Sequence, residues 1–202
     1  MVDIVRKTEA ASKVAVYICG TLLIMTSFLV CFEVIARKLL HYSLQGTDEL
    51  TGYAMAFTIA WGSGYALFSR SHIRVDVVYV LLSKRLRAVL DVIALFVFGA
   101  VIVVLCRYSV QLLLESWEYG SKSLTPMRTP LVIPQSIWFG GMMFFLICII
   151  VLFLKTAQSL IAGDIATVRR LAGAKSISEE VEEETRQVLS KSQHGQSEGT
   201  AS

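Results

Sequence analysis

Long apolar runs alternate along this chain with short polar connections. Four runs contain few or no charged side chains, and they cover residues 14–32, 50–68, 88–114 and 134–154. A helix rises 1.5 Å per residue, so about 20 apolar residues cross the roughly 30 Å hydrocarbon core of a bilayer. Only 17% of the residues are charged, whereas soluble proteins carry about 25%. The pattern predicts an all-α integral membrane protein with four transmembrane helices.

The polar segments divide the chain into three parts. We expect a cytoplasmic N-terminus over residues 1–13, a four-helix transmembrane domain over 14–156 and a polar, partly disordered cytoplasmic tail over 157–202. The first apolar run is longer than the roughly 7–15 residues of a signal peptide. It is therefore expected to remain in the protein as the first span.

The second run is only moderately hydrophobic and is rich in Gly, Ala and Ser. Small residues let helix backbones approach closely in lipid, where no hydrophobic force drives association. We therefore expect this helix to pack against other helices. Thr47 is expected as its N-cap, with Asp48 and Glu49 in the first turn, where carboxylates meet the positive end of the helix dipole.

A basic segment connects the second and third runs. Its apolar stretch VDVVYVLL precedes SKRLR, which is typical of a short helix lying at the membrane interface. His72 and Asp76 are four residues apart, but one His and one Asp are too few for a metal site. We expect them to anchor the loop by hydrogen bonds.

Lys and Arg are unevenly distributed between the two sets of connections. The N-terminus, segment 70–87 and the segment after the fourth run carry most of them, whereas the connections after the first and third runs carry few. Because cytoplasmic loops are enriched in Lys and Arg, both termini are predicted to be cytoplasmic.

The residue content argues against an enzyme. No apolar run contains a His, which excludes a membrane haem with two axial imidazoles, and no GxSxG, HExxH or Walker-type motif occurs. The four cysteines lie in or beside the apolar runs without a CxxC pair, as expected of buried free thiols. No basic patch interleaved with aromatic residues points to nucleic acid.

Glu33 and Arg37 stand four apart at the end of the first run, the favourable spacing for an ion pair on a helix. A small proton-coupled exporter would need a carboxylate such as Glu33 inside the membrane. Because Glu33 lies at the edge, we favour a surface pair or a contact with another subunit.

Four sequence features, taken in order, resemble a known family. They are Arg37, TDEL at 47–50, Trp61 with Gly64, and SRSHIRVD at 69–76. Together with four spans and cytoplasmic termini, they resemble the small DctQ-like membrane subunit of tripartite ATP-independent periplasmic (TRAP) transporters. The resemblance covers roughly residues 14–154 and leaves the tail outside.

The resemblance implies a secondary transporter of the bacterial cytoplasmic (inner) membrane. A periplasmic substrate-binding protein would capture an organic acid, such as a dicarboxylate or related carboxylate, and a large multi-span membrane subunit would carry it inward by sodium symport. The small subunit would brace its large partner. It would hold no cofactor, and sodium would act at the large subunit.

The resemblance also singles out candidate positions for partner contact or topology: Arg37, Asp48, Glu49, Trp61, Gly64, Arg70, His72, Arg74 and Asp76. Asp48 and Glu49 would face the periplasm, toward the large subunit or the binding protein. His72, Arg74 and Asp76 would fix the cytoplasmic turn. Helix capping and topology explain the same residues, so a stand-alone membrane scaffold or assembly factor is the alternative function.

Overall fold

The computed structural model describes residues 2–41, 46–69 and 83–164, together with 167, 168, 171 and 185. These residues form an all-α fold of four long helices: α1 (Val2–Leu40), α2 (Thr47–Phe68), α4 (Lys84–Glu118) and α5 (Val132–Ile161). The interfacial helix predicted between α2 and α4 lies outside the described residues.

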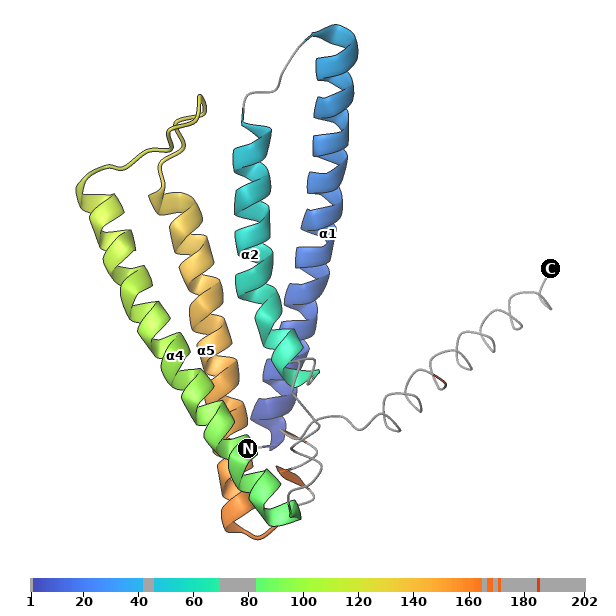
Figure 1. Ribbon diagram of the computed structural model, residues 1–202, viewed down its shortest axis with the longest axis vertical. Coiled ribbons are helices and arrows are strands. Elements are labelled where there is room, and N and C mark those ends of the chain that lie inside the picture. Colours follow the sequence, from blue (N-terminus) through green and yellow to red (C-terminus); the bar gives the residue numbers. More distant parts are fainter. Residues whose placement is uncertain are drawn as a thin grey trace, which may run out of the picture.

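The helices stand side by side in a row, in the order α1, α2, α5, α4 (Figure 1). The central pair, α2 and α5, packs together. Helix α2 also packs against α1, and α5 packs against α4 and makes a smaller contact with α1. The end of α1, the start of α2 and the segment between α4 and α5 lie at one end of the row, and the start of α1 and the end of α5 lie at the other (Figure 1). The start of α1 and the end of α5 therefore share one end of the row, and the cytoplasmic location of both termini stays a prediction.

Three of the helices are long and apolar enough to cross a membrane, namely α1, α4 and α5. They contain 39, 35 and 30 residues. At 1.5 Å per residue, even α5 is about 45 Å long and exceeds the hydrocarbon core. Helix α2 has 22 residues and is about 33 Å long, but its Gly, Ser and Thr residues dilute its apolar character. Three of the four predicted spans are therefore confirmed as helices that are long and apolar enough to cross a membrane.

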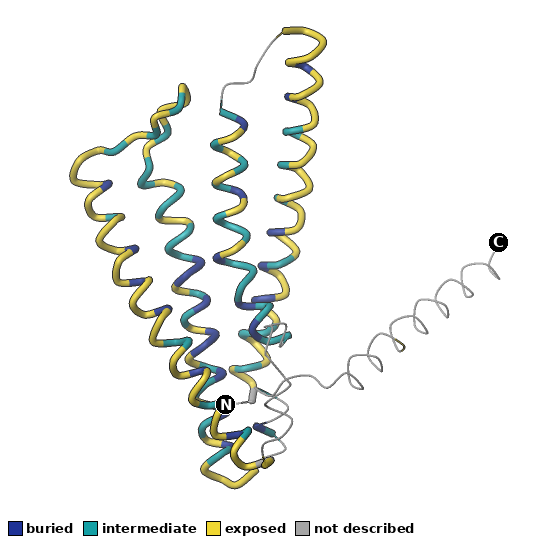
Figure 2. Tube along the Cα trace, in the orientation of Figure 1, coloured by how far each residue is buried: buried dark blue, intermediate teal, exposed yellow. Residues whose placement is uncertain are grey.

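The apolar core lies along α5 and the faces of α2 and α4 turned toward it. Its buried members are Ala60, Leu67, Leu95, Ile102, Cys106, Met142, Phe145, Cys148, Ile149 and Leu152. Figure 2 shows this concentration on α5, while the outer sides of α1 and α4 are exposed. Large apolar side chains occupy both outer sides, such as Phe28 on α1 and Val97 on α4. Apolar edges of this kind are stable when lipid or another membrane protein covers them.

Candidate functional site: the α2–α5 contact and the hydroxyl cluster at Glu49

Trp61 joins α2 to α5. Its indole Nε1 donates a hydrogen bond to the backbone oxygen of Ile137, with 3.1 Å between the two atoms. The ring stacks on Phe57 and on Phe144, with ring centroids 5.8 and 5.7 Å apart. It lies directly over Gly141, where an added Cβ would stand 2.6 Å from the indole Cδ1 atom. Only a glycine fits at that position, so the indole packs directly on the backbone of α5 and holds α2 against it.

Gly64 continues the same contact one turn further along α2. A Cβ added at Gly64 would stand 3.1 Å from both the Cys148 sulfur and the Phe144 ring. Ala60 is also buried in this interface. The small residues of α2 therefore bring the two backbones together, as the sequence predicted for this helix. The structure places the candidate residues Trp61 and Gly64 in a contact within the chain.

Glu49 lies at the centre of a cluster of hydroxyl groups at the other end of α2. The Tyr53 hydroxyl donates to one carboxylate oxygen, with 2.5 Å between the atoms, and the Thr125 hydroxyl donates to the other oxygen. The hydrogen bond from Tyr53, helped by the hydroxyls of Thr129 and Ser123, lowers the pKa of the Glu49 carboxyl against the opposing effect of desolvation. The carboxylate thus ties α2 to the segment between α4 and α5.

That segment, residues 121–131, is a hairpin. Its two arms are joined by hydrogen bonds from the Ser123 amide to Thr129 (2.9 Å) and from the Leu131 amide to Ser121 (3.0 Å). At its tip, Met127 lies against Gly46, where any added Cβ would collide with the Met127 side chain. The hairpin therefore docks on the start of α2 through one polar contact, at Glu49, and one apolar contact, at Met127.

The start of α2 differs from the sequence prediction. Gly46, not Thr47, is the N-cap, and no side chain caps the helix. Gly46 has a φ of 121°, a conformation that residues with a Cβ rarely adopt. Thr47 is buried in the first turn, followed as predicted by Asp48 and Glu49. Asp48 is exposed, whereas Glu49 is half-buried.

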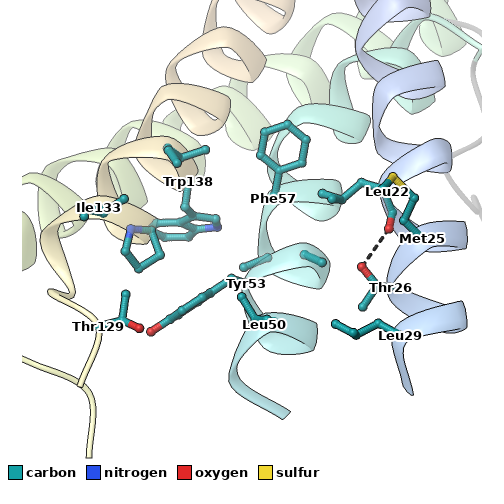
Figure 3. A pocket seen from close by; sticks show the side chains of 14 residues that line it. Leu22, Met25, Thr26, Leu29, Leu50, Tyr53, Phe57, Thr129, Ile133 and Trp138 are labelled. Carbon is teal, nitrogen blue, oxygen red and sulfur yellow. Dashed lines mark hydrogen bonds between the residues drawn. The ribbon is translucent and has the colours of Figure 1, made fainter. Parts of the chain in front are cut away.

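A pocket of about 590 Å³ opens between α1, α2 and the start of α5. Met25, Phe57 and Trp138 are among its mainly apolar lining residues. The hydroxyls of Tyr53 and Thr129 approach each other at one end (Figure 3), where Tyr53 donates its hydrogen bond to Glu49. Thr26 also lines the pocket, but its hydroxyl donates within α1 to the Leu22 carbonyl. The lining offers shape and apolar surface and contains no acid–base pair for catalysis.

Arg37 and Glu33 form the predicted ion pair near the end of α1. The prediction of a surface pair is wrong for the acid, because Glu33 is only 4% exposed, while the Arg37 side chain is 58% exposed. Burial of the acid makes this pair part of the packing around α1. The candidates Arg70, His72, Arg74 and Asp76 lie outside the described residues. Among the described residues, no group of three His, Cys, Asp or Glu side chains could hold a metal ion.

Sequence reasoning missed the partners of Glu49 and Trp61. Thr125 stands 76 positions after Glu49, and nothing in a single sequence joins two such distant residues. Two signals were nevertheless present. The connection SKSLTPMRTP is rich in hydroxyl residues, and the pair Gly140–Gly141 interrupts the large side chains of the fourth run.

The fold and these contacts define a helical membrane protein in which two central helices are locked together and a polar hairpin is fixed at one end. The chain matches the sequence model of the family described as tripartite ATP-independent periplasmic transporters, DctQ component, over residues 26–159. It belongs to that family, whose members are transporter subunits and not enzymes. Comparison with curated proteins and with solved structures gave no match.

Proposed function

We propose that this chain braces the large membrane subunit of a TRAP transporter while that subunit moves an organic acid across the bacterial cytoplasmic membrane. Membership of the DctQ family carries the transporter role, since the match covers all of α2 and α4, most of α5 and the C-terminal part of α1. The proposed partners are the large multi-span membrane subunit and a periplasmic substrate-binding protein.

The internal contacts support the bracing role. A brace has to keep its own shape while its partner changes conformation. In this chain two sets of contacts along α2 fix the shape. The Trp61 indole holds α2 against α5 within the row. Glu49 and Met127 hold the hairpin against the start of α2. Interfaces packed around fixed side chains resist gradual deformation, so the row is suited to hold a static part of the partner in place.

In this proposal α2 also spans the membrane, in addition to α1, α4 and α5. Its length of about 33 Å is sufficient, and its position between α1 and α5 (Figure 1) supports the assignment. A helix flanked by two others exposes less surface to lipid and tolerates more Gly, Ser and Thr residues. The distribution of Lys and Arg supports cytoplasmic termini, and with them a periplasmic location for the hairpin and the start of α2.

The substrate is proposed to be a dicarboxylate or a related carboxylate, read by the binding protein and the large subunit. Sodium would bind to the large subunit, so this chain would need neither an ion site nor a cofactor. The chain's contribution is mechanical, and its loss should abolish transport without changing substrate binding to the periplasmic protein.

Uptake measured with and without this chain tests the proposal. Cells expressing the binding protein and the large subunit should take up a labelled dicarboxylate in the presence of sodium only when this chain is also expressed. Immunoblotting should show the large subunit in the membrane in both cases. Equal uptake in both strains would favour the alternative of a stand-alone scaffold or assembly factor.

A further inference from the structure

The contacts described so far leave the outer face of α4 unexplained. Helix α4 packs on α5 through a stripe of buried residues spaced three and four apart, as in other paired helices. The stripe consists of Ala88, Asp91, Leu95, Ile102, Cys106, Ser109 and Ser116. On the opposite side, Val97, Val101 and Val104 are each more than half exposed.

Arg107 lies on that exposed side. The four apolar runs contain only two charged residues, Asp91 and Arg107. Asp91 is 1% exposed and interacts within the chain. Arg107 is exposed, and none of the described residues forms an ion pair or a hydrogen bond with its guanidinium group. Gln111 and Glu115 are also exposed and follow at intervals of four, so a polar row extends along an otherwise apolar face.

The depth of Arg107 makes this exposure costly in a membrane. The exposed Trp117 marks the nearer interface, where tryptophans gather. Arg107 precedes it by ten residues, which is about 15 Å along the helix, and lies inside the third apolar run. Arginine within the hydrocarbon faces the bundle interior, a water-filled cavity or a charged partner.

Lipid phosphate at the nearer interface is poorly placed to neutralise Arg107. Side chains leave a helix tilted toward its N-terminus, which for α4 is the Lys84 end. The Arg107 side chain therefore starts out directed away from the nearer interface. To reach a lipid phosphate there, the side chain would have to turn back along the helix. A carboxylate beside α4 within the membrane could pair with Arg107 without that turn. The surrounding valines and the exposed Ala100 suit close packing of a second helix.

We propose that the outer face of α4 docks the large membrane subunit of the transporter, and that Arg107 pairs there with a carboxylate on a membrane-embedded helix of that subunit. This inference rests on the proposed function. It assigns the partner to the α4 edge of the row and leaves the α1 edge to lipid.

Co-purification of the two subunits tests the assignment. Tagged wild-type chain, Arg107→Leu, Arg107→Lys and Lys38→Leu are each co-expressed with the large subunit and purified in mild detergent. Lys38→Leu is the matched control, because it removes an exposed cation from the other edge helix. Arg107→Leu makes α4 more apolar, so its insertion into the membrane is not weakened.

We expect Lys38→Leu to recover as much large subunit as wild type, Arg107→Leu at least tenfold less, and Arg107→Lys an intermediate amount. A photocrosslinking amino acid at position 104 should join the chain to the large subunit, whereas one at position 28 on α1 should not. An acidic residue near the crosslinked site, changed to Arg, should then restore recovery with Arg107→Glu.

Two results would overturn the inference alone. One is full recovery of the large subunit by Arg107→Leu, and the other is crosslinking from position 104 only to phospholipid. If the wild-type chain itself recovers no large subunit, the proposed function is wrong, and the inference with it. The wild-type purification shows this outcome by itself, so it is distinguished from a failure of the Arg107 variants.

Discussion

Single residues fix the geometry of the two central helices. The Trp61 indole packs on the backbone of Gly141, which has no side chain, and donates a hydrogen bond to the carbonyl of Ile137. These two contacts fix how α2 packs against α5. The presence of Trp61 and of small residues on α2 could be read from the sequence, and helix packing was predicted from them. Their partner could not be predicted, because the hydrogen bond joins residues 76 positions apart.

Gly141→Ala should destabilise the protein by about 1–3 kcal/mol, as overpacking of a filled interface usually does. The new Cβ would stand 2.6 Å from the Trp61 indole and 2.7 Å from the Ala60 Cβ. Thermal unfolding in detergent, followed by tryptophan fluorescence, measures the effect. Gly20→Ala is the matched control, since nothing lies within 4 Å of its added Cβ. Equal melting temperatures for the two variants would contradict the contact described here.

Glu49 should make stability depend on pH. The pKa of Glu49 in the folded protein is lowered from the usual value of 4.5. The ionised carboxylate is therefore more stable in the folded protein than in the unfolded chain. That stabilisation is complete above the unfolded pKa and is lost as the pH falls through the folded pKa. The melting temperature of wild type should therefore exceed that of Glu49→Gln at pH 7, and the gap should close as the pH is lowered below about 4.5. A gap that stays constant to pH 3 would show that the carboxylate charge is not involved.

Among the elements, the helices could be predicted and the hairpin could not. Each apolar run lies inside one helix, because twenty apolar residues in a row have few other ways to satisfy their backbone in a membrane. The run at 14–32 lies within α1, which continues beyond it at both ends. Hairpin 121–131 carries no comparable pattern. Its shape depends on docking against Gly46 and Glu49, and Gly46 also displaces the expected cap at Thr47.

Gly46→Ala should detach the hairpin from α2. The substitution strains a backbone with a φ of 121° and pushes a Cβ into Met127; the strain alone costs on the order of 1–3 kcal/mol. Hydrogen exchange at the Ser123 and Leu131 amides should become faster. Adding Met127→Ala relieves the collision but not the strain, so the double variant should recover only part of the protection. Unchanged exchange in Gly46→Ala would mean that the hairpin keeps its shape without this contact.

At the scale of the whole molecule, the row of helices has two apolar edges and a stiff centre. From the sequence, we predicted a membrane protein of four helices with the second packed against others. The order in which the helices lie in space could not be predicted. Contacts of Trp61, Gly64 and Gly99 with α5 place α5 between α2 and α4. The packing of α1 against α2 completes the order α1, α2, α5, α4. A flat row covers less of its own apolar surface than a closed bundle does. Membership of the DctQ family explains that shape if a larger membrane protein completes it.

The composition of the complex that this chain forms tests the bracing role most directly. The chain and the large subunit are co-expressed, purified in mild detergent through a tag on this chain, and weighed by native mass spectrometry. We expect a complex that contains both proteins and survives dilution. A chain that elutes without the large subunit, from membranes in which that subunit is shown to be present, would contradict the bracing role.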